Sequence, residues 1–118
     1  MDLLQILINC YNDNNFNDIE SVLTSDCSYA SQWVFEEMEG SRRIAEYLIT
    51  KTETIKRYKA YVLAKRTRIL APYRGQEGIL LYQGDLSNPA CLVLIKSKEN
   101  KIYHIDICDP GLFRYELM

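Results

Sequence analysis

Asp109 is the ionisable side chain in this sequence whose position most favours catalysis. It directly precedes Pro110 at the end of a pattern typical of a strand, where neighbouring aromatic side chains would desolvate it. Desolvation raises the pKa of a carboxyl group and makes it a usable acid or base near neutral pH. Asp-Pro is equally typical of a turn that ends a strand, so both interpretations stay open. We take Asp109 as the candidate catalytic residue.

The stretch SQWVFEEMEG, residues 31–40, places the only tryptophan, Trp33, beside three glutamates. Alternation over residues 27–35, CSYASQWVF, predicts a strand with Tyr29, Ser31 and Trp33 on one face. Glu36, Glu37 and Glu39 are expected in the loop after this strand, close to the start of a helix, where acidic charge is mildly favourable. We therefore interpret the glutamates as solvated rather than catalytic, although two of them can flank a pocket mouth.

The remaining reactive side chains favour structural interpretations. His104, the only histidine, alternates with Asp106 along a predicted strand, and we read the two as a solvated or interface pair rather than a catalytic dyad. The four cysteines lack zinc spacing and form no CxxC motif, so we expect small buried hydrophobes, with no metal, disulfide or cofactor. They are Cys10, Cys27, Cys91 and Cys108.

Length and composition predict one ordinary globular domain over residues 1–118. The chain has 47% hydrophobic and 25% charged residues and a formal net charge of −2. A basic face for broad nucleic-acid binding is not indicated. The segment MDLLQILINC lacks the pattern of a secretory signal, and no run approaches the ~20 apolar residues of a membrane span. We expect a cytoplasmic protein that binds neither nucleic acid nor membranes.

Helical periodicity indicates three helices in the first half of the chain. The first covers residues 2–11. A second, capped by Asn15 or Asn17, would carry an apolar stripe of Phe16, Ile19, Val22 and Leu23. The third is long and begins after Gly40 with Ser41 as N-cap; its apolar face is formed by Ile44, Leu48, Ile55 and Tyr58, flanked by Ala45 and Tyr47.

The second half has the pattern of an antiparallel meander. Strands are predicted over residues 60–70, 78–86, 90–97 and 101–109, separated by turn-forming segments. Arg66 and Arg68 share one face of the first of these strands, either solvated outside or with one arginine reaching inward to hold an anion. The order of elements predicts an α+β fold, in which three N-terminal helices cover one face of a cone-shaped, curved antiparallel or mixed sheet.

Three motifs carry a resemblance to a known superfamily. They are NDNNFNDIESVLTSDCSYAS, MEGSRRIAEYL and KIYHIDICDP, which together span nearly the whole chain. In order and separation they resemble the approach to the first strand, the opening of the long helix and the last strand of nuclear-transport-factor-2-like (NTF2-like) proteins. This superfamily includes ketosteroid isomerases, SnoaL-like polyketide cyclases and scytalone dehydratase.

The resemblance implies a pocket between the sheet and the helices but not the isomerase chemistry. The position of the isomerases' general base falls on Ser31, that of their first-helix tyrosine on Leu7, and that of their sheet aspartate near Leu92. None of these side chains fills the corresponding role. The single histidine likewise does not match the paired histidines of a dehydratase site.

By the same resemblance, Tyr103 and Asp109 face the pocket, together with aromatic side chains from the rest of the sheet and helices. The predicted ligand-binding set is Tyr29, Ser31, Trp33, Tyr47, Tyr82, Tyr103 and Asp109. Our first hypothesis is a non-catalytic protein that binds an apolar or aromatic small molecule. The second is a cyclase, isomerase or dehydratase with Asp109 as acid/base and Tyr29 or Ser31 orienting a carbonyl.

The third hypothesis is a protein-interaction module. In many NTF2-like relatives the convex sheet face is a dimer surface, so the resemblance implies a homodimer through that face. The C-terminal segment GLFRYELM is unusually apolar for a free end, and we expect it to fold back on the domain or onto a dimer mate.

Overall fold

In the computed structural model of the chain, seven strands form one mixed sheet in the order β2-β1-β6-β5-β4-β3-β7. The structure describes residues 2–58, 60 and 62–118. Neighbouring strands are antiparallel except β1 and β6, which are parallel. The strands are β1 Leu23–Ser31, β2 Val34–Glu39, β3 Val62–Ala71, β4 Glu77–Gln83, β5 Cys91–Lys98, β6 Lys101–Cys108 and β7 Arg114–Leu117.

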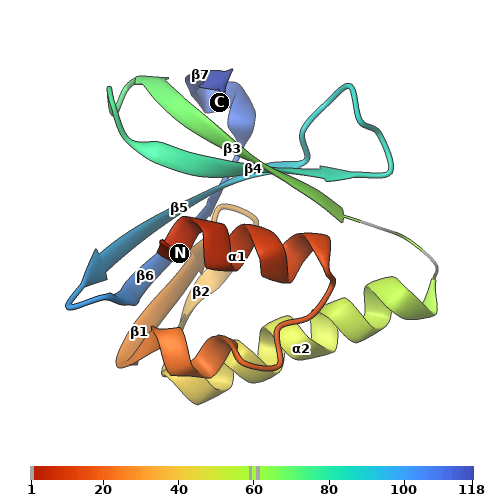
Figure 1. Cartoon of the computed structure of the whole chain (residues 1–118), viewed down its shortest axis with the longest axis vertical. Helices are drawn as coiled ribbons and strands as arrows, with labels where there is room; N and C mark the ends of the chain where they lie inside the picture. The colour runs from red at the N-terminus through yellow and green to blue at the C-terminus, as the bar shows by residue number, and fades with distance from the viewer. Residues whose placement is uncertain (1, 59, 61) are drawn as a thin grey trace.

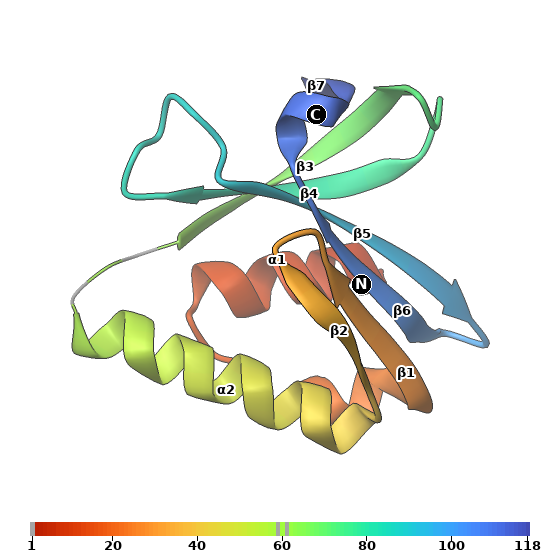
Figure 2. The same ribbon diagram turned by 180° about the vertical axis from the view of Figure 1, so that it is seen from behind.

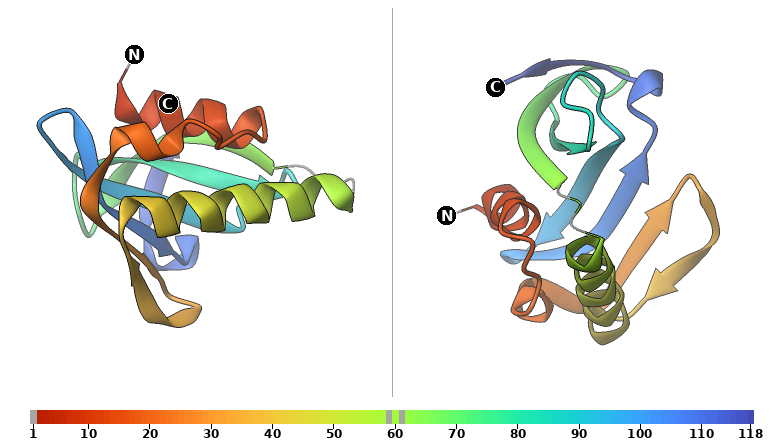
Figure 3. Two further views of the ribbon diagram at one scale, coloured as in Figure 1. Left: turned by 90° about the horizontal axis from the view of Figure 1, so that it is seen from below. Right: turned by 90° about the vertical axis from the view of Figure 1, so that its right-hand side faces the viewer.

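The sheet curves around two α-helices that lie on its concave face, α1 Leu3–Asn12 and α2 Ser41–Arg57 (Figures 1 and 3). In the right-hand view of Figure 3 the strands form an arc beside the two helices. The predicted α+β class and the curved sheet are confirmed. The prediction of three helices is corrected to two α-helices and two 3-10 turns, η1 Ile19–Val22 and η2 Pro110–Leu112.

The predicted second helix is only the 3-10 turn η1, because the chain enters β1 already at Leu23. The side chain of Asn15 accepts a hydrogen bond from the backbone N–H of Asn17 at 3.0 Å, so it stabilises a local turn instead of capping a helix. The apolar residues of the predicted stripe keep their role: Phe16 and Ile19 are each 1% exposed. The sequence therefore predicted the burial of Phe16 and Ile19 correctly, but the helical conformation predicted for this segment was wrong.

Both α-helices begin close to their predicted starts. Asp2 caps α1 by accepting from the backbone N–H of Gln5 at 2.8 Å. For α2 the cap is Gly40 at φ 102°, a left-handed conformation that favours glycine, and Ser41 is the first helical residue rather than the N-cap. The buried face of α2 includes Ile44 and Leu48, but Tyr58 is 75% exposed, which corrects its predicted place on that face.

The largest local difference from the sequence prediction lies in residues 27–35. They do not form one strand, because the chain reverses at Gln32 and Trp33 and returns as β2. Figure 2 shows this β1–β2 hairpin at the edge of the sheet. The three glutamates expected in a loop therefore belong to β2, which runs to Glu39 before Gly40 begins the turn into α2.

The second half follows the predicted meander closely. The strand predicted over residues 60–70 corresponds to β3, although its residue 61 lies outside the described part of the chain. The apolar C-terminal segment folds back, and β7 adds to the edge of β3 with Ile69 opposite Tyr115. The Oγ1 atom of the fully buried Thr67 donates to the backbone oxygen of Glu116 at 2.7 Å and fastens this edge strand.

Alternation gives the sheet two apolar faces. The inner face packs on the helices and forms the main core, which includes Ile44, Ile79, Ile102 and Ile105. The outer face carries a second cluster of Ile69, Leu80, Tyr82, Leu92 and Leu94, against which Phe113 and Tyr115 pack. The C-terminal segment thus covers apolar surface of the sheet that the helices do not reach.

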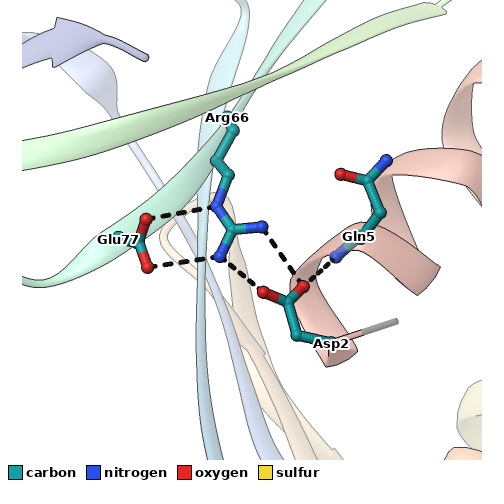
Figure 4. A network of polar contacts seen from close by, with 4 residues as sticks. All are labelled: Asp2, Gln5, Arg66 and Glu77. Carbon is teal, nitrogen blue, oxygen red and sulfur yellow. Dashed lines mark hydrogen bonds and ion pairs between the residues drawn. The ribbon is translucent and has the colours of Figure 1, made fainter.

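Arg66 ties the start of α1 to the inner face of the sheet (Figure 4). Its guanidinium contacts Asp2 at 2.7 Å and Glu77 at 3.2 Å. The sequence left open whether an arginine of β3 points outside or reaches inward for an anion; the anions here are two carboxylates of the chain itself. Hydrogen bonding to Arg66 lowers the pKa of Asp2.

Candidate functional site

A hollow lies between α2, the end of β1 and the inner face of β4, β5 and β6. Its outer part, here called the mouth, has a volume of about 250 Å³ and is lined by Tyr29, Ser31, Trp33, Tyr47, Lys51 and Cys91, among others. Behind it the inner hollow, between the helices and the sheet, has a volume of only about 40 Å³. The deep part of the cone is therefore nearly filled by side chains, and the space for a ligand is at the mouth.

Large apolar side chains fill the inner hollow. Phe16 meets Tyr11 edge to face with ring centroids 4.9 Å apart, and Leu48, Leu81 and Ile107 complete the walls. A volume of about 40 Å³ leaves room for one or a few water molecules, because each water molecule needs roughly 10–15 Å³. Little open space therefore remains between the helices and the inner face of the sheet.

Two tyrosines form the wall between the mouth and a neighbouring cavity. Tyr29 on β1 and Tyr47 on α2 have ring centroids 5.5 Å apart with planes tilted by 59°. Tyr29 is 5% exposed, and burial raises its pKa, with a smaller contribution from Tyr47. Its hydroxyl is therefore protonated at neutral pH and available as a neutral hydrogen-bond donor or acceptor.

Among the described residues that line the mouth and the inner hollow, Lys51 is the one with a charged side chain. Its Nζ lies 5.6 Å from the ring centroid of Tyr47, within cation–π range. Burial raises the pKa of the nearby Cys91 thiol to about 11, while the charge of Lys51 acts in the opposite direction. The thiol is consequently neutral at physiological pH and adds no negative charge beside Lys51.

Trp33 reaches the mouth from the β1–β2 turn rather than from a strand, and its side chain is 58% exposed. The Oγ atom of Ser31 accepts from the backbone N–H of Trp33 at 3.3 Å, which fixes the turn. Gln32, which also belongs to the turn, donates its backbone N–H to the oxygen of Ile107 and accepts through its side-chain oxygen from the backbone N–H of Asp109. The indole therefore lies on a turn that Gln32 holds to the end of β6.

A side lobe of about 190 Å³ adjoins the mouth and shares Tyr29, Ser31 and Tyr47 with it. Its further lining includes Glu36 on β2 and Arg43 on α2, which carry opposite charges. Glu36 is thus the one glutamate of the three that reaches a cavity wall. Glu37 and Glu39 do not line it.

The structure brings together four of the seven predicted ligand-binding residues and separates the other three. Tyr29, Ser31, Trp33 and Tyr47 line the mouth. Tyr82 is directed to the outer face and packs in the second apolar cluster, with Lys65 Nζ 5.6 Å from its ring centroid. The expected inward direction of Tyr82 is corrected because β4 directs Ile79, Leu81 and Gln83 inward, and Tyr82 alternates with them.

Tyr103 and Asp109 lie at opposite ends of β6, and neither lines the mouth. Tyr103 is 36% exposed beside the β5–β6 turn, under the Nζ of Lys98 at 5.5 Å from its ring centroid. A register shift between Lys96 and Ser97 breaks the alternation there, so Tyr103 does not share the inward face of Ile105. Asp109 is exposed and caps η2 by accepting from the backbone N–H of Gly111 at 2.9 Å.

A second polar cluster lies on the outer face around His104, which is half-buried. The ring contacts Ser28 through Nδ1 and Asp106 through Nε2 at 3.0 Å, and Glu37 lies 3.6 Å from Nδ1. An Nε2–H that donates to Asp106 leaves Nδ1 as acceptor for the Ser28 hydroxyl. The predicted neighbour pair of His104 and Asp106 is therefore part of a network that joins β1, β2 and β6.

Sequence reasoning missed several residues of the hollow. Lys51, Gln83 and Cys91 line the mouth, and none was a candidate. For Lys51 a signal existed: it follows Tyr47 by four residues on the predicted helix and so shares its face. For Cys91 and Gln83 the inward direction depends on strand phase, which the sequence did not determine.

The described residues hold no group of three or more His, Cys, Asp or Glu side chains arranged to bind a metal ion. The four cysteines are free thiols. Neither α1 nor α2, the two α-helices in the described part of the chain, has the length and apolar character that crossing a membrane needs.

Comparison with known proteins finds similarity in structure. No family model matches the sequence, and no curated protein matches it. An NTF2-like protein of unknown function from Cytophaga hutchinsonii is 13% identical, with 95% of each chain covered and a TM-score of 0.61. A steroid delta-isomerase from Pseudomonas aeruginosa is 12% identical, covering 89% of this chain and 74% of that one, with a TM-score of 0.63. A LEH-like epoxide hydrolase from M. tuberculosis is 17% identical, covering 93% and 78%, with a TM-score of 0.57.

The chain therefore has the NTF2-like fold, as the resemblance in its motifs predicted. At these identities the similarity establishes the architecture alone. Within that fold a function must be argued from the residues around the hollow.

Proposed function

We propose that the protein binds a small apolar or aromatic molecule in the mouth of the cone, without catalysing its conversion. The observation that carries the proposal is the open space of about 250 Å³ walled by Tyr29, Tyr47 and the exposed Trp33. Drug-sized sites usually measure about 300–1,000 Å³, so the expected ligand is small, for example a single ring with a short substituent. The hydroxyls of Tyr29 and Ser31 supply orienting hydrogen bonds.

The single tryptophan makes the proposal directly testable. Trp33 lines the mouth, so a titration of small aromatic compounds should shift the indole N–H signal in ¹H–¹⁵N correlation spectra and change the fluorescence. Tyr47→Ala removes a wall and should weaken binding about threefold to tenfold, the worth of one aromatic contact. The matched control is Tyr58→Ala, which removes a 75% exposed tyrosine that follows the same helix and should leave affinity unchanged.

Native mass spectrometry of the protein as purified provides an independent readout, because a resident ligand adds a defined mass. An aromatic panel that leaves the Trp33 signal unmoved, together with an unliganded mass spectrum, would overturn the proposal. Equal weakening by Tyr47→Ala and Tyr58→Ala would show that binding occurs elsewhere on the surface.

An enzyme of the cyclase, isomerase or dehydratase kind is the alternative, favoured by the isomerase and epoxide hydrolase among the structural neighbours. In it Asp109 is the acid/base, and its weak point is geometric, since that carboxylate is exposed and already accepts from Gly111. Asp109→Asn should abolish turnover of any substrate found while preserving the fold. Retained turnover would remove Asp109 from the mechanism.

A homodimer through the outer face of the sheet and a cytoplasmic location are further proposals that the sequence motivates. Four free thiols fit a reducing compartment. Light scattering of the full chain tests the dimer: a mass near 13.8 kDa would contradict it, and twice that mass would support it.

A further inference from the structure

The charge around the hollow differs from the charge of the chain as a whole. Acidic residues outnumber basic ones, and the net charge is −2. Around the mouth and the inner hollow, in contrast, Lys51 is the one charged side chain that the described part of the chain places in the walls. The remaining walls are aromatic, aliphatic or neutral polar. A positive charge in this place is therefore not a consequence of the overall composition.

Lys51 also has no carboxylate within ion-pair distance among the described residues. Within the described residues no ion pair involves this side chain, although carboxylates lie within 4 Å of Arg42, Arg66 and Arg68 elsewhere on the chain. The ring of Tyr47 attracts the ammonium by a cation–π contact without cancelling its charge. The ammonium keeps three hydrogen-bond donors for a ligand.

Neutral groups that can support an anion line the same hollow as Lys51. The hydroxyl of Tyr29 is protonated because its buried environment raises its pKa, and the thiol of Cys91 is protonated for the same reason. Ser31 and Gln83 add further polar atoms to the lining of the mouth. The side lobe is lined by one acidic and one basic residue, Glu36 and Arg43, so its lining carries no net charge.

We infer that the ligand of the mouth is a small organic anion, an apolar or aromatic body that carries one carboxylate, with the carboxylate held by Lys51. This inference deepens the proposed function and rests on it. The ring lies between Trp33 and the tyrosine wall, while the carboxylate takes the position at Lys51, where one face of the mouth opens to water. A positively charged ligand would be repelled by the ammonium of Lys51.

The test compares carboxylates with their neutral amides, which have nearly the same shape. Benzoate with benzamide and phenylacetate with phenylacetamide are titrated at low salt, with the Trp33 indole signal as readout. Each carboxylate should bind about threefold to tenfold more tightly than its amide, the range expected for a partly solvated, charge-assisted contact. The preference should shrink as salt is added, because the contact is accessible to counterions.

Three variants locate the charge. Lys51→Met keeps the apolar stem and should weaken carboxylate binding more than amide binding, so that the preference for the carboxylate disappears. Lys51→Arg keeps the charge and should retain most of the preference. Lys56→Met is the matched control, because it removes an exposed charge from the last turn of α2, away from the hollow.

The outcomes separate this inference from the proposed function. If carboxylates and amides bind equally, or if the preference survives in Lys51→Met, the anion inference is overturned and binding in the mouth stands. If neither class moves the Trp33 signal, the proposed function itself fails. Loss of the preference in Lys56→Met as well would assign it to overall charge and would also overturn the inference.

Discussion

Ile105 and Ile107 provide a stability test of whether the hollow is open. Both belong to β6 and point to its inner face, but Ile105 is 1% exposed within the core, whereas Ile107 is 8% exposed and lines the mouth and the inner hollow. Replacement by alanine removes the same three carbon atoms at each position. Any difference in cost therefore reports the space around the side chain.

The expected losses of unfolding free energy have two contributions, the transfer of apolar carbon atoms and the cavity that their removal leaves. Losing three buried carbons costs about 2.4 kcal/mol in transfer free energy at ~0.8 kcal/mol each. Around Ile105 the space has no outlet, and if ~70 Å³ stays empty the cavity adds about 1.7 kcal/mol at ~24 cal/mol per Å³. We expect Ile105→Ala to lower the free energy of unfolding by about 4 kcal/mol and Ile107→Ala to lower it by about 2–2.5 kcal/mol. The second cost is smaller because the space left by the Ile107 side chain joins the mouth, which is already open to solvent.

Urea unfolding followed by circular dichroism measures both free energies of unfolding under the same conditions. The valine variants at the two positions give an intermediate step and guard against complete loss of folding. Ile107→Ala should also admit larger ligands at the mouth, and Ile105→Ala should not. Equal losses at the two positions would refute the reasoning, since they would place Ile107 in a closed core.

Three further predictions concern particular contacts. Thr67→Val should lower the free energy of unfolding by about 1–2 kcal/mol, because the buried hydroxyl that holds β7 is lost. Thr67→Ser keeps a hydroxyl and should lower the free energy of unfolding by less. Urea unfolding of the two variants measures the difference. Arg66 lowers the pKa of Asp2 in the folded protein. The ionised Asp2 side chain therefore stabilises the fold fully at pH values above its pKa in the unfolded chain, about 3.9. This stabilisation is lost as the pH falls through the lower pKa that Asp2 has in the folded protein. Unfolding curves between pH 2 and 6 should accordingly be less pH-dependent for Asp2→Asn, and an unchanged slope would exclude this contribution. Burial raises the pKa of all four cysteine thiols, to about 11 for Cys27, Cys91 and Cys108. Because the thiolate is the reactive form, Ellman's reagent should label the native protein slowly at pH 8 and the unfolded protein fast. Rapid labelling of the native protein would contradict the burial of these thiols.

Much of the site could be anticipated because it depends on short-range patterns. Tyr29 and Ser31 were assigned to one face of a strand by alternation, and Tyr47 to the flank of a helix by its spacing from Ile44 and Leu48. The structure places all three around the mouth. Period 2 and period 3.6 are properties of the local backbone, so the sequence states them directly.

The misplaced residues share a different cause. Trp33 was placed in a strand because CSYASQWVF alternates without an obvious turn signal, yet the chain reverses at Gln32 and Trp33, where Ser31 and the backbone of β6 fix the turn. Tyr103 was placed inward because the register shift beside it cannot be seen in the sequence. Both errors arise where pairing with another strand overrides local alternation.

The amino-acid sequence by itself determined the α+β class, the positions where α1 and α2 begin, the meander and many of the apolar residues that fill the cone. These depend on periodicity and burial, which act over a few residues. Only the tertiary structure decided that Asp109 caps η2, that Tyr82 faces outward and that Lys51 lines the mouth beside Tyr47. Those facts depend on strand register and on contacts between residues far apart in the chain, because a shift of one residue exchanges the two faces of a strand.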